Sequence, residues 1–305
     1  MLIYKFGGSY LNSNVNYTKI YRLIKRKITK EKVIIVVSAI GRNEVFSTNT
    51  LLKESSYLSD IEKDAFLSLG EQYSSLKLTN YLSQKGLKTR CILASELYLN
   101  IDDSYYIDSN AYSKYFNGYD CIIVPGFIGK DNEGFIKTLG RSGSDLTAIL
   151  LAKAFGLKDV YLNKDTKGIY SCNDDIISNK ETLKCLSYDQ ANTYFTYTGE
   201  AVQLKALEIA KENSINIHII NLDSRFETLI SDIKNEWCIY GLTSIEDKIY
   251  LFGKTDDYTL EVIKSFLKDY EITSLVVRVG FIELIVNKNS INQIMNDIHK
   301  RFIEN

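Results

Sequence analysis

The sequence has few of the residues on which disulfide-rich and metal-binding proteins depend. Its five cysteines are dispersed, none forms a C-x-x-C pair, and only two histidines are present. A disulfide framework and a zinc site are therefore not expected, and we predict no metal ion held by the protein's own side chains. With histidine so scarce, the chemistry is not expected to depend on imidazole.

Charge of one sign and long apolar runs are missing as well. The formal net charge is −1, and the basic segment 19–32 has apolar residues at helical spacing, which is typical of a solvated helix. A nucleic acid or an acidic membrane would favour a basic patch, so we expect neither as a partner. No apolar run is long enough to span a membrane and no signal peptide precedes the first strand pattern, so we expect a cytoplasmic protein.

Short apolar runs alternate with amphipathic helical patterns over the first two thirds of the chain. Several of the runs are apolar on both faces, as buried parallel strands require. The alternation predicts an α/β layered fold, in which ligands gather at the carboxyl ends of the strands. We predict strands at 2–6, 32–40, 88–95, 121–129, 159–165 and 215–221, helices at 17–30, 58–85, 109–117, 144–156, 187–197 and 200–213, and a hairpin turn at 131–134.

The pattern changes after about residue 222. A strand segment at 238–254, a helix at 257–272, two strands at 273–280 and 281–288 and a helix at 291–303 give the order β-α-β-β-α. This order is most of a ferredoxin-like module. The segment 222–237 is interpreted as a linker, which predicts two domains at 1–225 and 237–305.

Six segments could carry chemistry, and five of them stand at the ends of predicted strands. Glycines at a strand end let backbone N–H groups approach a ligand, and a neighbouring lysine supplies a point charge suited to phosphate. Each segment alone is a weak signal, and the phosphate-loop pattern GxxxxGK[ST] is absent. The segments are "KFGGS" (5–9), "SAIGR" (38–42), "LSLGEQ" (67–72, inside a predicted helix), "VPGFIG" (124–129), "TLGRSGSD" (138–145) and "LNKDTKGIY" (162–170).

The segment 138–156 places Arg141 and Asp145 where an apolar helix begins. Helix starts attract anions, because their first N–H groups lack partners and the helix dipole is positive there. Opposite fixed charges at such a start indicate a ligand that carries both signs of charge. The alternative is an ordinary loop in which Ser144 or Asp145 caps the helix.

Taken together, these segments resemble the amino-acid kinase family, and within it the aspartate kinases. "KFGGSY" is similar to the family's "KFGGTS", "VVSAIG" to "VVSAMG", "TLGRSGSDLTA" to "TLGRGGSDxTA" and "KDTKGIY" to "TDVDGVY", and "VPGFIG" is identical. The resemblance covers about residues 1–222 in the same order. It implies an α/β fold, a three-layer α/β/α sandwich with a mainly parallel central sheet, followed by a small C-terminal ferredoxin-like ACT domain.

The resemblance also implies a reaction, the transfer of the γ-phosphoryl group of ATP to the side-chain carboxylate of L-aspartate with Mg²⁺, and a homodimer. Arg141 would bind the α-carboxylate of the substrate and Glu71 its α-ammonium. The implied catalytic residues are Lys5, Gly8, Ser9 and Asp145. The implied substrate-binding residues are Ser38, Glu71, Gly126, Phe127, Arg141, Gly143 and Ser144. The implied ATP-binding residues are Lys5, Gly7, Gly8, Lys164, Asp165, Gly168, Tyr170 and Lys205.

The sequence departs from the family pattern at several positions. Tyr10 follows Ser9 where the family usually has a serine, Asp175 replaces an arginine, and Glu200 stands where the family has a lysine. The last two changes remove positive charge from the nucleotide side, which Lys164, Lys167, Lys205 or magnesium could restore. Two alternatives therefore stay open: an amino-acid-binding homologue without catalysis, and a kinase with a different acidic acceptor. The ACT-like segment lacks the "DRPG" ligand loop, and its use in pairing across a dimer is the remaining expectation.

Overall fold

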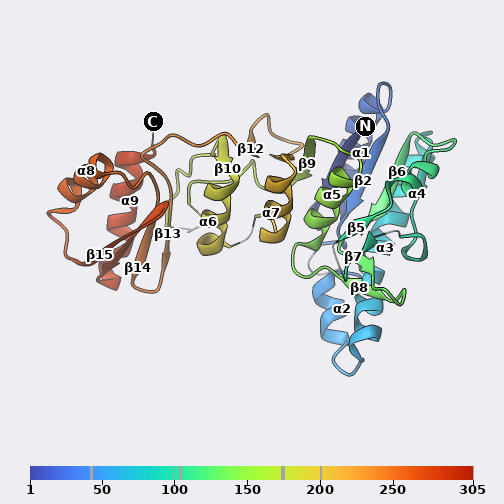
Figure 1. The fold of residues 1–305 in the computed structure, drawn as a ribbon, viewed down its shortest axis with the longest axis horizontal. Coiled ribbons are helices and arrows are strands. Elements are labelled where there is room, and N and C mark those ends of the chain that lie inside the picture. Colours follow the sequence, from blue (N-terminus) through green and yellow to red (C-terminus); the bar gives the residue numbers. More distant parts are fainter. Residues whose placement is uncertain (42–43, 98, 103–104, 173–175, 200, 305) are drawn as a thin grey trace. The chain divides into compact units, whose positions relative to one another are not determined.

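The computed structural model describes residues 1–305 except 42–43, 98, 103–104, 173–175, 200 and 305. The chain forms two compact units (Figure 1). The first contains residues 1–167 and 202–227, and the second contains residues 168–201 and 228–305. The boundaries at 225 and 237 expected from the sequence stay a prediction. Asp175 and Glu200 lie outside the described residues.

The first unit is built on a parallel sheet with the strand order β11-β9-β1-β2-β6-β3. All five residues of β2 are buried, which explains the apolar runs on both faces that the sequence shows. The predicted α/β class is confirmed, and β1 has the expected bounds, although the other strands are shorter than expected. They are β1 (Leu2–Phe6), β2 (Val33–Val37), β3 (Thr89–Cys91), β6 (Cys121–Pro125), β9 (Asp159–Asn163) and β11 (Asn216–Ile220).

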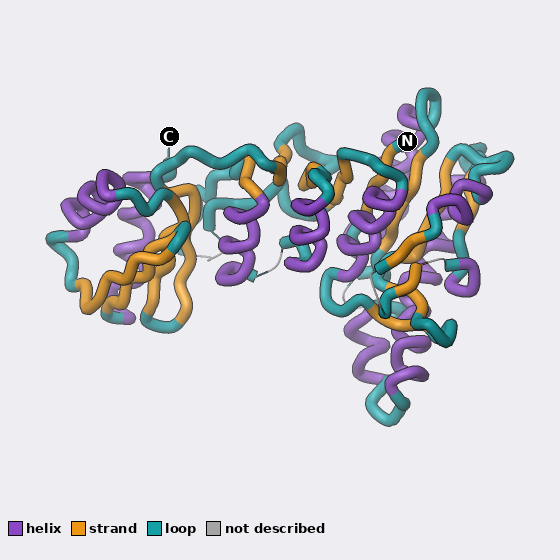
Figure 2. The backbone as a smooth tube through the Cα atoms, viewed as in Figure 1, coloured by secondary structure: helices purple, strands orange, loops and turns teal. Residues whose placement is uncertain are grey.

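Helices cover both faces of this sheet, so the unit has three layers (Figure 2). α1 (Asn14–Lys27) and α3 (Asp60–Gln84) bury their apolar side chains against one face. α5 (Gly143–Ala154) packs against β1, β2 and β9, and α7 (Leu204–Glu212) packs against α5. Ten consecutive residues of α5 are buried, from Gly143 to Ala152. The start of α5 is therefore held tightly against the sheet, together with the charged residue it carries there.

A second, smaller sheet completes the first unit. Its strand order is β5 (Tyr106–Ile107), β4 (Leu99–Asn100), β7 (Ile128–Lys130) and β8 (Ile136–Thr138). β7 and β8 are antiparallel and joined at 131–135, so the predicted hairpin is confirmed. The expected single strand at 121–129 is instead two strands, β6 and β7, because the chain turns at Gly126 and Phe127, whose φ is +67°. The short helices of this unit are η1 (Gly8–Leu11), α2 (Thr48–Glu54), η2 (Ala94–Glu96) and α4 (Ser109–Lys114).

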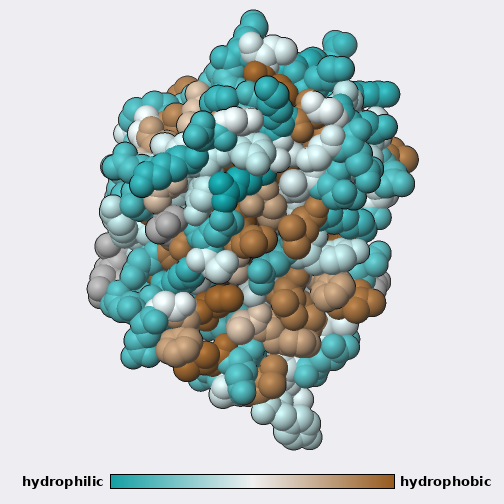
Figure 3. Space-filling model, turned by 90° about the vertical axis from the view of Figure 1, so that its right-hand side faces the viewer, coloured by the Kyte–Doolittle hydropathy of each residue, from teal (hydrophilic) through white to brown (hydrophobic). Residues whose placement is uncertain are grey.

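The helical pair α2 and α3 exposes apolar side chains to solvent. Figure 3 shows apolar side chains gathered in the lower half of the face it displays, the height at which α2 and α3 lie in Figure 1. The exposed members on these helices and the turn between them are Leu52, Tyr57, Leu58, Ile61, Leu69, Tyr73 and Leu76. Such side chains are seldom gathered on the surface of a monomer.

The second unit combines a parallel pair, β10 (Cys185–Ser187) and β12 (Glu227–Ser231), with α6 (Tyr188–Thr198) and an antiparallel sheet. β12 lies within the segment interpreted as a linker, so this segment is not a bare connection. The sheet has the order β13-β14-β16-β15, and α8 and α9 pack on one of its faces (Figure 1). Its elements are β13 (Ile239–Ile245), β14 (Lys248–Gly253), α8 (Asp257–Leu267), β15 (Ile272–Arg278), β16 (Phe281–Val286), η3 (Lys288–Ser290) and α9 (Ile291–Phe302).

This ferredoxin-like module corrects one expectation. The segment 238–254 was predicted as one strand, but it forms the hairpin β13–β14, which reverses at Glu246 and Asp247. The order is therefore β-β-α-β-β-α, and the additional strand gives the module four strands. A predicted ferredoxin-like C-terminal module is thus confirmed with a different element order. Among the described residues, no helix is both long enough and apolar enough to cross a membrane.

Candidate active site

The tips of four neighbouring strands, β9, β1, β2 and β6, carry most of the residues singled out by the sequence. A cavity of about 820 Å³ opens at the tips of β9, β1 and β2 and the start of α5. It brings together eight predicted site residues, which are Lys5, Gly7, Gly8, Ser9, Ser38, Arg141, Lys164 and Asp165. Residues up to 160 positions apart in the sequence therefore share one site, as expected for a parallel α/β sheet.

A buried cluster of three charges lies at this cavity. Asp145 is fully buried at the start of α5. Its Oδ1 forms an ion pair with Lys5 Nζ and its Oδ2 forms one with Lys164 Nζ, each at 2.7 Å. Burial acts to raise the pKa of Asp145, but Lys164 and Lys5 hold it below its ordinary value. Burial lowers the pKa of Lys5 to about 8, with Asp145 opposing and Lys164 adding to the decrease. The cluster has two cations for one carboxylate, so it attracts anions.

Glu71 is a second buried acid near the cavity. Its Oε1 accepts the backbone N–H of Ala39 at 2.9 Å, while no partner for its Oε2 is found among the described residues. Burial raises the pKa of Glu71 to about 8, against the pull of that N–H and of Lys5. A buried carboxylate with one free oxygen costs stability unless a ligand donates to it. It is therefore suited to receive a cationic group.

Two glycines are required here by close packing. A Cβ on Gly8 would lie 2.4 Å from the carbonyl oxygen of Ala39, so the β1 and β2 tips could not keep their approach. A Cβ on Gly126 would lie 2.7 Å from the Cβ of Ser144. The glycines at these strand ends thus let the backbone of three segments converge.

The start of α5 is not capped in the way the alternative interpretation expects. The N-cap residue is Ser142, at φ +59°, and its side chain makes no capping hydrogen bond. Asp145 is engaged with the two lysines, and Ser144 Oγ accepts a hydrogen bond from Ser38 Oγ at 3.1 Å. The interpretation of Ser144 or Asp145 as an ordinary cap was wrong, because both side chains have tertiary partners.

Other predicted site residues do not line the cavity. Gly126, Phe127, Gly143 and Ser144 pack behind it, where the N–H of Phe127 is donated to Thr147 Oγ1. Lys205 is exposed and pairs with Glu208 on its own helix at 2.7 Å. Gly168 and Tyr170 belong to the second unit. The ATP-binding roles of Gly168, Tyr170 and Lys205 therefore stay predictions.

The structure also adds residues that the sequence did not reveal. Asn163, at the end of β9, is fully buried; its Nδ2 donates to the carbonyl of Lys5 at 3.1 Å, and Oδ1 has no partner among the described residues. An asparagine at a strand end beside Lys164 was the available signal. Asn12 and the segment 47–49 also line the cavity. Within the described ranges, no group of three or more His, Cys, Asp and Glu side chains could hold a metal ion.

Comparison with known proteins places this geometry in a family. The chain is 26% identical over 231 residues to aspartokinase 1 of Bacillus subtilis, covering 72% of this chain and 57% of that protein. It is 28% identical over 272 residues to an aspartokinase of Rickettsia bellii, covering 82% of this chain and 66% of that protein. The chain thus spans about three fifths of the length of these relatives.

Solved structures show the same fold. Aspartokinase III of E. coli, in complex with aspartate and ADP, matches with a TM-score of 0.66 at 18% identity over 94% of this chain and 79% of that chain. The UMP kinase of Ureaplasma parvum matches with a TM-score of 0.54 at 19% identity over 75% and 97%. The model of the amino acid kinase family matches residues 1–221. With that match and this arrangement of strand tips, the chain belongs to the amino acid kinase family.

Proposed function

We propose that this protein is an aspartate kinase, which transfers the γ-phosphoryl group of ATP to the side-chain carboxylate of L-aspartate and forms 4-phospho-L-aspartate. The observation that carries the proposal is the Lys5–Asp145–Lys164 cluster at a cavity lined by Gly7, Gly8 and Arg141. Both reactants are anions at the reacting atoms, so a site that brings them together must neutralise their repulsion. The two curated relatives compared above, both named aspartokinases, support the choice of substrate.

The phosphate side of the site would use Lys5 and the β1 tip. A carboxylate oxygen of aspartate attacks the γ-phosphorus as the bond to the ADP oxygen breaks, and negative charge builds on the transferred oxygens. Lys5 would stabilise that charge, and backbone N–H groups of Gly8 and Ser9 would hold the oxygens. Asp145 positions the Lys5 ammonium, because the two are 2.7 Å apart and Asp145 is fully buried. Lys164 and Asp165 would lie on the nucleotide side.

The amino-acid side would use Arg141 and Glu71. Arg141 lines the cavity and makes no ion pair with any described residue, so its guanidinium is available for the substrate α-carboxylate. Glu71 would receive the α-ammonium on Oε2, which no described residue contacts by a hydrogen bond. Ser38, hydrogen-bonded to Ser144, would complete the pocket. The opposite charges at the start of α5 are then explained by a zwitterionic substrate.

Three further parts of the proposal rest on the sequence and the family. Mg²⁺ would arrive bound to the nucleotide phosphates, where it would neutralise charge, and Asp165 lines the same cavity on the proposed nucleotide side. We propose a homodimer as the assembly. We propose the cytoplasm as the place of the reaction.

The test is an aspartyl hydroxamate assay with ATP, Mg²⁺ and aspartate. Product is expected for the wild type, and Lys5→Ala is expected to reduce it by about a thousandfold, as the loss of a charge-stabilising group does. A wild type that binds aspartate but forms no hydroxamate above the Lys5→Ala level contradicts the proposal and favours an amino-acid-binding homologue without catalysis. The replaced charges at Asp175 and Glu200 are the observation behind that second candidate.

The same assay identifies the acceptor. Glutamate, N-acetylglutamate and carbamate replace aspartate in parallel reactions, and none is expected to exceed it. N-acetylglutamate is the sharpest of these, because acetylation removes the ammonium that Glu71 would receive. Faster turnover with any of the three would assign the chain to an amino-acid kinase with another acceptor.

A further inference from the structure

Two positions at which the sequence departs from the family pattern lie together in the structure. Tyr10 stands where "KFGGTS" has its serine, and Lys164 stands where "TDVDGVY" has its threonine. The two residues are 154 positions apart, yet Tyr10 Oη donates to the backbone carbonyl of Lys164 at 3.2 Å. The departures are therefore in direct contact.

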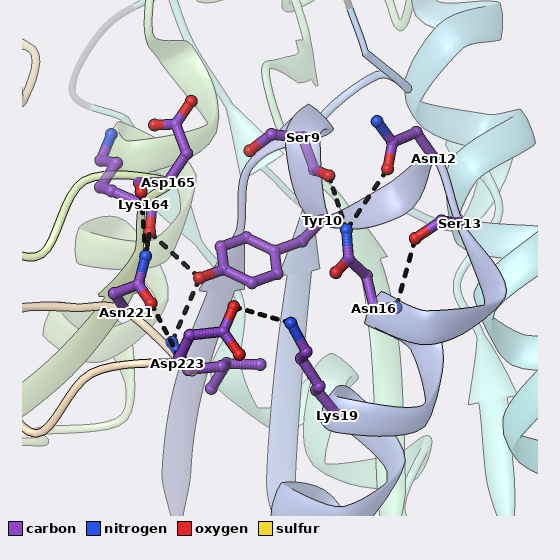
Figure 4. A network of polar contacts seen from close by, with 11 residues as sticks. Ser9, Tyr10, Asn12, Ser13, Asn16, Lys19, Lys164, Asp165, Asn221 and Asp223 are labelled. Carbon is purple, nitrogen blue, oxygen red and sulfur yellow. Dashed lines mark hydrogen bonds and ion pairs between the residues drawn. The ribbon is translucent and has the colours of Figure 1, made fainter.

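Within the described part of the chain, Tyr10 is one of two residues whose side chains donate to the backbone carbonyl of Lys164 (Figure 4). Its ring is buried, and Oη also accepts the N–H of Leu222 at 3.1 Å. Burial raises the pKa of Tyr10, so the phenol stays protonated and can donate. On the other side, Asn221 Nδ2 donates to the carbonyls of Lys164 at 3.1 Å and Asp165 at 2.9 Å.

The third anchor of this segment is the backbone itself. The N–H of Lys164 is donated to the carbonyl of Ile220 at 2.9 Å. With its N–H and its carbonyl both held, Lys164 has little freedom except in its side chain, which is 19% exposed and lines the cavity. The ammonium group reaches Asp145 Oδ2, while Lys5 uses Oδ1 of the same carboxylate.

The arrangement adds a cation to the site. With Lys5 alone, Asp145 would make a neutral pair; with Lys164 the cluster carries a net positive charge beside the glycines of the β1 tip. A lysine at a cavity edge that shares its partner carboxylate can turn toward a phosphate without leaving that carboxylate uncompensated. A threonine at this position could not do so.

We propose that Tyr10 and Asn221 are positioning residues that hold Lys164 as a second phosphate-binding cation, and that this coupled pair of departures supplies positive charge that the sequence lacks at Asp175 and Glu200. The inference rests on the proposed function for its phosphoryl donor. It assigns to Tyr10 no contact with substrate, since the hydroxyl acts through the backbone of Lys164.

The experiment compares Tyr10→Phe, Lys164→Thr and the double variant in the hydroxamate assay. Lys164→Thr is expected to raise the KM for ATP about tenfold, because it removes a charged hydrogen-bond donor. Tyr10→Phe keeps the ring in the core and loses one hydroxyl, so a rise of about threefold is expected. The KM for aspartate should change less than about twofold, which separates positioning from general damage.

The double variant decides whether the two residues act as a unit. If Tyr10 acts through Lys164, the double variant is no worse than Lys164→Thr alone. Two effects that multiply would show independent roles and overturn the inference. An unchanged KM for ATP in Tyr10→Phe would also overturn it. Asn221→Ala loosens the same carbonyl from the other side and is expected to act in the same direction as Tyr10→Phe.

Two controls keep the result interpretable. Tyr115→Phe removes a phenol that donates to the carbonyl of Glu96 at 3.0 Å, a matched hydrogen bond in the same unit and away from the cavity; its KM for ATP should equal that of the wild type. The pH profile gives a second readout. Lys164 helps to lower the pKa of Lys5, so Lys164→Thr should move the alkaline limit of activity to higher pH than in the wild type.

The charge argument has its own test. Asp175→Arg with Glu200→Lys, introduced into Lys164→Thr, is expected to recover most of the lost ATP affinity. No recovery would contradict the compensation.

MgADP binding measured by calorimetry on the same variants requires no turnover. A wild type without kinase activity therefore fails the proposed function, whereas equal MgADP affinity in the wild type and Lys164→Thr fails this inference.

Discussion

The two units bury different kinds of polar groups. In the first unit Lys5, Glu71 and Asp145 are ionisable groups at most 5% exposed, and all three lie at or behind the cavity. Among the described residues of the second unit, the buried polar side chains are serines, threonines and an asparagine, with His299 as the exception that can take up a proton near neutral pH. Burying a charged group lowers the stability of the fold, and in the first unit the groups with this cost lie where the chemistry is proposed. The second unit is packed around an apolar core.

The largest expected effect separates activity from stability across the units. Lys5→Met should reduce kinase activity about a thousandfold or more, while the midpoint temperature of thermal unfolding should change little. Leu251→Ala, in the core of the second unit, should lower the free energy of unfolding by about 2–5 kcal/mol but leave kcat of the folded enzyme near that of the wild type. Parallel hydroxamate assays and thermal melts measure both. Loss of kcat in a folded Leu251→Ala would show that the second unit also serves catalysis.

Glu71→Gln should sharpen the comparison, because it exchanges function for stability in the first unit. The KM for aspartate should rise about tenfold or more, since an ionic partner for the ammonium is lost. The pKa of folded Glu71 is raised to about 8, so its contribution to stability is complete below its ordinary pKa and is lost as the pH rises to about 8. Glutamine avoids this loss.

The variant should therefore melt higher than the wild type at pH 8, by about 3 °C or more, and the difference should shrink toward pH 5. Thermal melts of both proteins at the two pH values measure it. The neighbours that act on Glu71 are the N–H of Ala39 and Lys5, and neither changes in the variant. A difference that is equal at both pH values would show that the carboxyl is not strained by burial.

The titratable exception in the second unit gives an acid-sensitive counterpart. His299 is fully buried, with Ser171 Oγ 3.0 Å from Nε2 and Glu304 3.4 Å from Nδ1. Burial lowers its pKa, although Glu304 and Glu181 oppose this. The unfolded chain then binds the proton more strongly, so stability should fall below about pH 6.5, by up to about 1.4 kcal/mol per pH unit.

Trp237 is the single tryptophan and packs against the core of the second unit, so its fluorescence reports this transition. His299→Gln should flatten the acid slope of the fluorescence melt. If the slope between pH 6.5 and pH 5 is the same in both proteins, another group titrates and the assignment to His299 is wrong.

The smallest expected effect concerns the turn that gives the second unit its additional strand. Glu246 has φ +59°, a conformation that costs a side chain energy and glycine none. Glu246→Gly should raise stability by about 0.5 kcal/mol in denaturant melts followed by Trp237 fluorescence. Asp247→Gly is the matched control, and it should lower stability because Asp247 has an ordinary φ. Equal effects of both would mean that the turn does not limit the hairpin.

Much of the first unit follows from local pattern. A run such as 33–37 with no polar side chain predicts a buried strand, and the glycines that follow Lys5 at the end of β1 predict a ligand site at that tip. The helix starts at 14, 60 and 143 lie within three residues of the expected positions. These features depend on residues that are neighbours in the sequence, which is why they could be predicted.

Other features depend on partners distant in sequence. Nothing near Glu246 marks the reversal that splits 238–254 into two strands, because its turn lacks glycine, asparagine and proline. β12 is unremarkable in sequence and becomes a strand by pairing with β10. In the sequence, Tyr10 is only a departure from a motif, and the structure is needed to show that its hydroxyl donates to the carbonyl of Lys164.

By itself, the sequence determined the class of the fold and the strand tips that bear glycines and charges, because hydrophobic periodicity and backbone freedom are local properties. Only the tertiary structure decided that Lys5 and Lys164 share one buried carboxylate and that one oxygen of Glu71 has no partner among the described residues. Electrostatic interactions depend on the distance between groups and on their burial, and neither quantity can be derived from the order of the residues in the sequence.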